Sequence, residues 1–180
     1  MNITRHLLLL LLITSLLAGC GFTLKKPAVL APSLHQLYLK TPDPYGQLER
    51  DLREYLKMSH VHLVSSEQAA QVVLEILHED VSQQLLSVSS TQQTRQYTLF
   101  YKVTFQLTNN KGLVIYSPQT ITETSTLTVQ SNQILASGSE TSLLYQVMRK
   151  AAASDIMNRL AAKEITTTVN KMSKQPQTTP

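Results

Sequence analysis

The feature that most constrains this 180-residue chain is a strict alternation of apolar and polar side chains around residues 97–107. The apolar positions are Tyr97, Leu99, Tyr101, Val103, Phe105 and Leu107. The positions between them are polar except for Phe100. Because successive side chains of a strand point to opposite faces, the pattern predicts a strand with one buried and one exposed face. We expect the apolar face to pack against helices.

Further extended segments flank this strand. We predict strands at residues 35–40, 71–77 and about 113–130, and a brief extended piece at 61–64. The last long strand carries threonine at every second position from Thr120 to Thr128. Such β-branched side chains suit an exposed sheet face. The polar run 82–94 is expected to form the extended ends of two strands and their turn, projecting beyond the helices, although a floppy loop has the same composition.

Two helices are predicted. Asp43 before Pro44 suggests a helix start, with an N-cap acceptor followed by proline at the first helical position. Apolar residues at Leu48, Leu52 and Leu56 then follow at helical spacing. The second helix is expected over 139–165, with Ser137 and Glu140 at capping-box spacing. Residues 166–180 lose periodicity and are predicted to be a disordered tail.

The element order is therefore β-α-β-β-β-α. It predicts an α+β fold with a single mixed four-stranded sheet and two helices packed on one face. We expect four segments: a lipoprotein signal peptide at 1–19, an acylated cysteine and tether at 20–33, one domain at 34–165, and the tail.

The N-terminus predicts export and a lipid anchor. Arg5 precedes an apolar stretch that begins at Leu7 and is too short to span a bilayer. The stretch ends in Leu-Ala-Gly-Cys at 17–20, which resembles a bacterial lipobox, and Cys20 is the chain's only cysteine. We expect Cys20 to be acylated; an ordinary signal peptide is the alternative. Gly21, rather than an aspartate, follows it, which by resemblance implies sorting to the outer membrane.

No catalytic pattern is apparent in the sequence. It contains no Gly-x-Ser-x-Gly elbow, phosphate-binding loop or dinucleotide fingerprint. His60 and His62 could face one side of a strand as metal ligands do, but no third ligand is near, and we expect a polar turn leading into a strand instead. The carboxylates of residues 49–54 interleave with arginines and are expected to form a solvated helix face. With a net charge of only +4 and scattered basic residues, nucleic-acid binding is not expected. We predict a non-enzyme without cofactor or metal.

Five short segments, in order, resemble the family of lipopolysaccharide-assembly lipoproteins LptE. They are Cys20-Gly21-Phe22-Thr23-Leu24, Asp43-Pro44-Tyr45-Gly46-x-Leu48 with Leu52-Arg53, Thr94-x-x-Tyr97, the stretch 132–140, and Met148-Arg149 with Ile156 and Arg159-Leu160. The resemblance covers residues 20 to about 160.

The resemblance implies an outer-membrane lipoprotein that plugs and helps assemble a large β-barrel, LptD, and assists lipopolysaccharide insertion into the outer leaflet. Its partners would be that barrel, lipopolysaccharide and the membrane through its anchor. It would face the periplasm and the barrel lumen. The alternatives are an accessory lipoprotein of another outer-membrane assembly machine and a periplasmic enzyme.

The chain departs from better-known members where these carry basic residues for lipid A phosphates, because Ser90 and Ser137 stand at the corresponding places. Arg95 and Lys102 are the nearby cations and the candidate lipopolysaccharide contacts. An exposed arginine that keeps a hairpin soluble is the alternative for Arg95, which we place at the base of the hairpin. The expected partner-contact residues are Ser87, Ser90 and Gln92.

Overall fold

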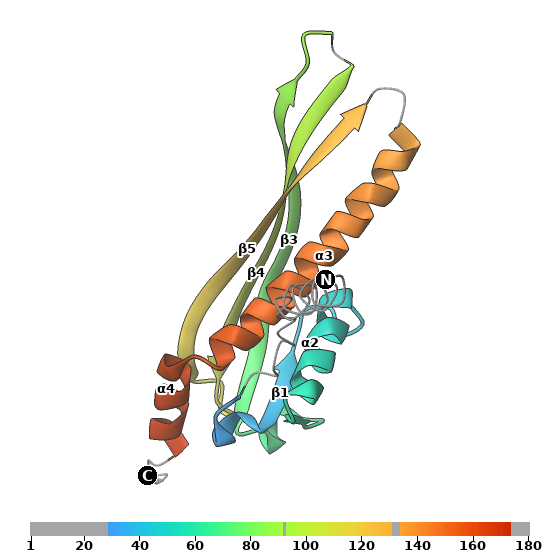
Figure 1. Cartoon of the computed structure of the whole chain (residues 1–180). Helices are drawn as coiled ribbons and strands as arrows, with labels where there is room; N and C mark the ends of the chain where they lie inside the picture. The colour runs from blue at the N-terminus through green and yellow to red at the C-terminus, as the bar shows by residue number, and fades with distance from the viewer. Residues whose placement is uncertain (1–28, 92, 131–133, 174–180) are drawn as a thin grey trace, which may run out of the picture.

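Three long strands and one long helix give the molecule an elongated shape (Figure 1). The computed structural model describes residues 29–91, 93–130 and 134–173. The elements in order are η1 (Pro32–Leu34), β1 (Gln36–Lys40), α2 (Gln47–Met58), β2 (His62–Leu63), η2 (Glu67–Ala69), β3 (Val72–Val88), β4 (Thr94–Thr108), β5 (Val114–Gln130), α3 (Ile134–Leu160) and α4 (Lys163–Ser173). The predicted signal peptide, most of the tether and Cys20 lie outside the described residues.

The strands form one mixed sheet in the order β2-β1-β3-β4-β5. β1 runs parallel to β2 and β3, whereas β3, β4 and β5 form an antiparallel meander. The α+β class and the mixed sheet are confirmed, but the sheet has five strands rather than four. The additional strand is β2, which lies within the brief extended piece predicted at 61–64 but was not expected in the sheet. It pairs only His62 with Gln36 and Leu63 with Leu37. A two-residue strand leaves almost no alternation in a sequence.

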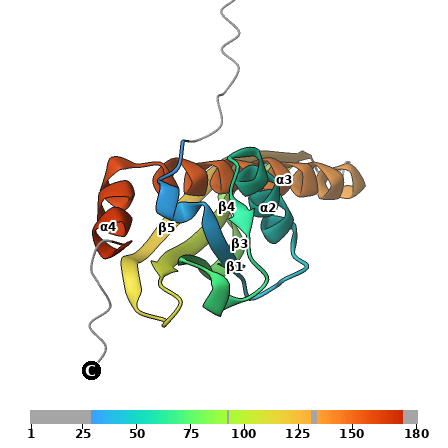
Figure 2. The ribbon, with the colours of Figure 1, turned by 90° about the horizontal axis from the view of Figure 1, so that it is seen from below.

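Alternation along β4 correctly predicts which face is buried. Leu99, Val103, Phe105 and Leu107 are fully buried and Tyr101 is nearly so. They face α2 and α3, which lie on one side of the sheet when the molecule is viewed from below (Figure 2). The other face carries the exposed threonine row of β5, also as predicted. A tight turn joins these strands, in which Gly112 has φ +78° and Asn109 accepts hydrogen bonds from the backbone N–H groups of Lys111 and Leu113.

The first helix begins later than predicted. Asp43 does not cap it, because its carboxylate accepts a hydrogen bond from the Tyr45 N–H at 3.1 Å. Gly46 is the N-cap, and helix α2 starts at Gln47. A Cβ at Gly46 would lie 3.0 Å from the Asp43 carboxylate, which favours glycine in this turn.

The C-terminal helices also differ from the prediction. Helix α3 begins at Ile134, so the Ser137–Glu140 spacing lies within the helix and does not mark its start. It ends at Leu160 rather than near residue 165, and a third helix, α4, occupies 163–173, most of which lies in the segment 166–180 predicted to be disordered. Ile165 and Val169 of α4 are buried in the common core. The hydroxyl of Ser33 donates to the Asn170 side chain at 2.8 Å, which joins α4 to the start of the domain.

Candidate functional site

The candidate site is the half of the meander that extends away from β1 and α2 (Figure 1). All residues of β3 from Val81 to Val88 are exposed. β3 ends at Val88 and β4 begins at Thr94, so the described residues of 82–94 form two strand ends and part of the turn between them, as the sequence predicts. The hairpin extends past the visible start of α3 (Figure 1).

Two of the three predicted partner-contact residues, Ser87 and Ser90, lie near the hairpin tip. The Ser87 hydroxyl donates to the Gln96 side-chain oxygen across the strands at 3.0 Å. Ser90 is exposed in the turn. Gln92 lies outside the described residues. The tip and the start of α3, which contains Ser137, lie at the same end of the molecule (Figure 1).

The two predicted cations do not form one site. Arg95 pairs with Val88 at the distal end of the hairpin, not at its base as predicted. It belongs to the odd-numbered residues of β4, whose other members face the helices, whereas Lys102 belongs to the even-numbered set on the opposite face. They are seven residue steps apart along the strand, a distance of about 23 Å. They cannot hold the same phosphate group.

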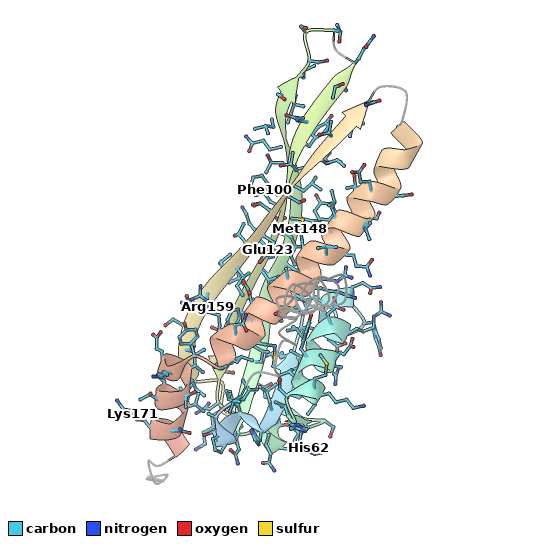
Figure 3. All side chains as sticks on the ribbon, in the orientation of Figure 1. His62, Phe100, Glu123, Met148, Arg159 and Lys171 are labelled. Carbon is cyan, nitrogen blue, oxygen red and sulfur yellow. The ribbon has the colours of Figure 1, made fainter. Side chains whose placement is uncertain are left out.

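The face of the extension opposite α3 is open and polar. Threonines of β5 line it, and Thr104 and Thr120 share a hydrogen bond at 2.9 Å. The Lys102 ammonium lies 5.8 Å from the centroid of the Phe100 ring. Met148 of α3 is buried on the other face (Figure 3). The open face thus offers many neutral hydrogen-bonding groups and few charges.

A polar cluster between the helices and the sheet was not predicted. Arg149 of α3 donates to Asp51 of α2 at 2.8 Å, and both side chains are largely buried. The Tyr101 hydroxyl donates to Glu79 at 2.5 Å. Burial, helped by this bond to Glu79, raises the pKa of Tyr101, so the phenol stays protonated. The expectation of a solvated carboxylate face on α2 is wrong for Glu49 and Asp51, since both are buried.

The histidine pair forms no site. His60 follows α2 with φ 59°, and His62 lies on β2; both side chains are exposed. Within the described ranges, no group of three or more His, Cys, Asp or Glu side chains is arranged to hold a metal ion. In the same part of the chain, no helix has the length and apolar character needed to cross a membrane.

Comparison with known proteins decides the family. A family model described as lipopolysaccharide-assembly LptE matches residues 34–160. The chain belongs to the LptE family. The resemblance drawn from the sequence is thereby confirmed, and with it the coarse functional class of lipopolysaccharide-assembly lipoprotein.

Relatives and solved structures agree with this assignment. The LPS-assembly lipoprotein LptE of Yersinia enterocolitica is 31% identical over 160 residues, which cover 87% of this chain and 76% of that protein. The LptE of Pectobacterium atrosepticum is 29% identical over 144 residues, covering 79% and 77%. Rare lipoprotein B from Shewanella oneidensis superposes with a TM-score of 0.63 at 27% identity over 72% of this chain and 96% of that one. A lipoprotein B from Nitrosomonas europaea gives 0.66 at 24% identity, covering 79% and 91%, and shows the same fold.

Proposed function

We propose that this member of the LptE family is an outer-membrane lipoprotein that plugs the lumen of an LptD-like β-barrel. In this role it helps the barrel assemble and assists lipopolysaccharide insertion into the outer leaflet. It acts by binding and not by catalysis. The observation that carries the proposal, beside the family itself, is the open face of the long meander.

The chemistry of that face fits the inside of a barrel. Barrel lumens are polar, and hydroxyl and amide side chains hydrogen-bond to polar walls without burying an unpaired charge. The threonines at 120–128 of β5 and the neutral polar residues of β4 provide such groups along much of both strands. The length of the meander also gives a plug many contact points at once.

A lipid anchor makes this association efficient. An acylated Cys20 holds the protein at the membrane, so that binding to a barrel in the same membrane becomes effectively intramolecular. We assign Arg95, at the hairpin tip, as the contact for a lipopolysaccharide phosphate, since a guanidinium binds phosphate through two parallel hydrogen bonds. Lys102 lies on the open face, about 23 Å from Arg95, and is therefore assigned to a contact other than the phosphate bound by Arg95.

The anchor gives the first testable prediction. Cys20→Ala is expected to abolish incorporation of labelled palmitate and to leave the protein soluble or wrongly sorted in the periplasm, because no acyl chain then holds it. Labelling and membrane fractionation in cells measure both effects. Palmitate label that persists in Cys20→Ala contradicts the assignment.

The hairpin tip gives the second prediction. A photocrosslinking amino acid at Ser87 or Ser90 is expected to give adducts with the barrel or with lipopolysaccharide in cells, because both positions lie on the projecting extension. Lys57, exposed on α2 at the other end of the molecule, is a control position outside the proposed contact. If neither serine gives adducts while positions on α3 give strong ones, the contact surface lies elsewhere.

A further inference from the structure

A cavity opens where β1 separates from β3. The two strands pair only as far as Lys40 opposite Glu75, and the chain then turns away from the sheet through residues 41–43. At the same level, β3 has an irregularity between Ile76 and His78 and continues, still paired with β4, without a neighbouring strand on the β1 side. The space left between them has a volume of about 370 Å³ and is closed on a third side by the start of α2.

The edge of β3 is unpaired from this cavity onward. Within the described residues, no strand pairs with β3 beyond Glu75 on the side of β1. One described contact there is the hydrogen bond from the Tyr145 hydroxyl to the Ser82 carbonyl, at 3.1 Å. An open strand edge presents backbone donors and acceptors that another extended segment can pair with.

Between the irregularities that follow Ile76 and Leu85, the edge contains no proline, so every residue keeps its backbone N–H donor. Edges are commonly protected by proline, lysine or glycine-associated bulges, and β5, the opposite edge of the sheet, contains Pro118. Residues 76–88 contain no proline, lysine or glycine. Val81 is 54% exposed at the rim of the cavity. This half of β3 therefore has the properties of a strand that accepts a partner.

The cavity adds a charge preference. Leu48 and Ile76 provide a buried apolar floor, and Asp43, Glu49 and Glu79 supply carboxylates. Among these, Glu49 is paired with Arg53, which is not a lining residue, and Glu79 accepts the Tyr101 hydroxyl. Apart from His78, no lining residue is basic. An aliphatic chain ending in a cation is complementary to such a pocket, which describes lysine and arginine.

We propose that the β3 edge at Ile76–Val81 binds an extended segment of the barrel partner and that an arginine or lysine of this segment enters the cavity. The inference rests on the proposed function and deepens it, because it gives the barrel a specific docking point. Backbone pairing along the edge provides affinity, and the acidic cavity selects the register of the bound segment.

The test is photocrosslinking in cells from Leu77 and Val81, both of which line the cavity and are partly exposed. We expect adducts with the co-purifying barrel that map, by mass spectrometry, to a segment containing arginine or lysine. Asp43→Asn with Glu79→Gln should lower the yield from Val81 about tenfold, since both substitutions keep the shape and remove charge. Glu54→Gln, an exposed carboxylate on α2, is the matched control and should leave the yield unchanged.

The outcomes separate this inference from the proposed function. If neither position gives adducts while the barrel still co-purifies, the docking site alone is wrong. It is also wrong if Asp43→Asn with Glu79→Gln leaves the crosslinking yield from Val81 unchanged while thermal melting shows an intact fold. Absence of any co-purifying barrel contradicts the proposed function itself.

Discussion

Phe105→Ala is expected to lower the free energy of unfolding by about 3–5 kcal/mol, the usual range for deleting a buried phenylalanine ring. Phe105 is fully buried on the face of β4 that packs against the helices, and it pairs with Ile76 of β3. The loss combines the transfer of the ring from the core with the cavity left behind. A two-state urea melt of the unacylated chain measures it.

Phe100→Ala is the matched control, because it deletes the same ring from the opposite face of the same strand. Phe100 is only half-buried and its described ring contact is with the Lys102 ammonium, so we expect a loss of about 1 kcal/mol or less. If Phe105→Ala costs less than about 1 kcal/mol, or no more than its control, the burial assigned to the two faces is wrong.

Arg149→Met is expected to destabilise the protein by about 3 kcal/mol, because it leaves the Asp51 carboxylate largely buried without its partner. Asp51→Leu combined with Arg149→Met should recover most of this loss, since no unpaired charge then remains. Urea melts of the two single variants and the double variant give the coupling energy directly.

Lys40→Met serves as the comparison for an exposed ion pair. Lys40 is 46% exposed where it meets Glu75 at 3.2 Å, so about 1 kcal/mol or less is expected from its removal. Equal losses from Arg149→Met and Lys40→Met, or additive losses in the Asp51–Arg149 double variant, contradict a buried coupled pair.

Local periodicity predicts much of this fold. The alternation of β4 and the threonine row of β5 are properties of single strands, and both faces follow from them without knowledge of the partners. The polar extension was likewise predictable, because residues 82–94 contain too few apolar side chains to form core. The pattern predicts the ends of helices and strands least well, because a few local contacts determine where an element begins. The close approach of Asp43 to Gly46 is an example.

The missed features depend on tertiary contacts. The break after Leu160 consists of two alanines, Ala161 and Ala162, although alanine favours helix. It allows Ile165 and Val169 to return to the core. The Asp51–Arg149 pair joins residues far apart in the sequence, and on α2 alone Asp51 is indistinguishable from a solvated carboxylate. The cavity beside β3 forms where β1 departs, which no local pattern encodes.

Mild-detergent co-purification of the acylated protein from cells tests the central claim most directly. A tag is placed after α4, the last described element, which lies at the end of the molecule away from the hairpin tip (Figure 1). The account predicts one large outer-membrane β-barrel as the main partner, retained through washing and identified by mass spectrometry. Recovery of a complex of several lipoproteins without such a barrel, or of the lipoprotein alone, contradicts the account.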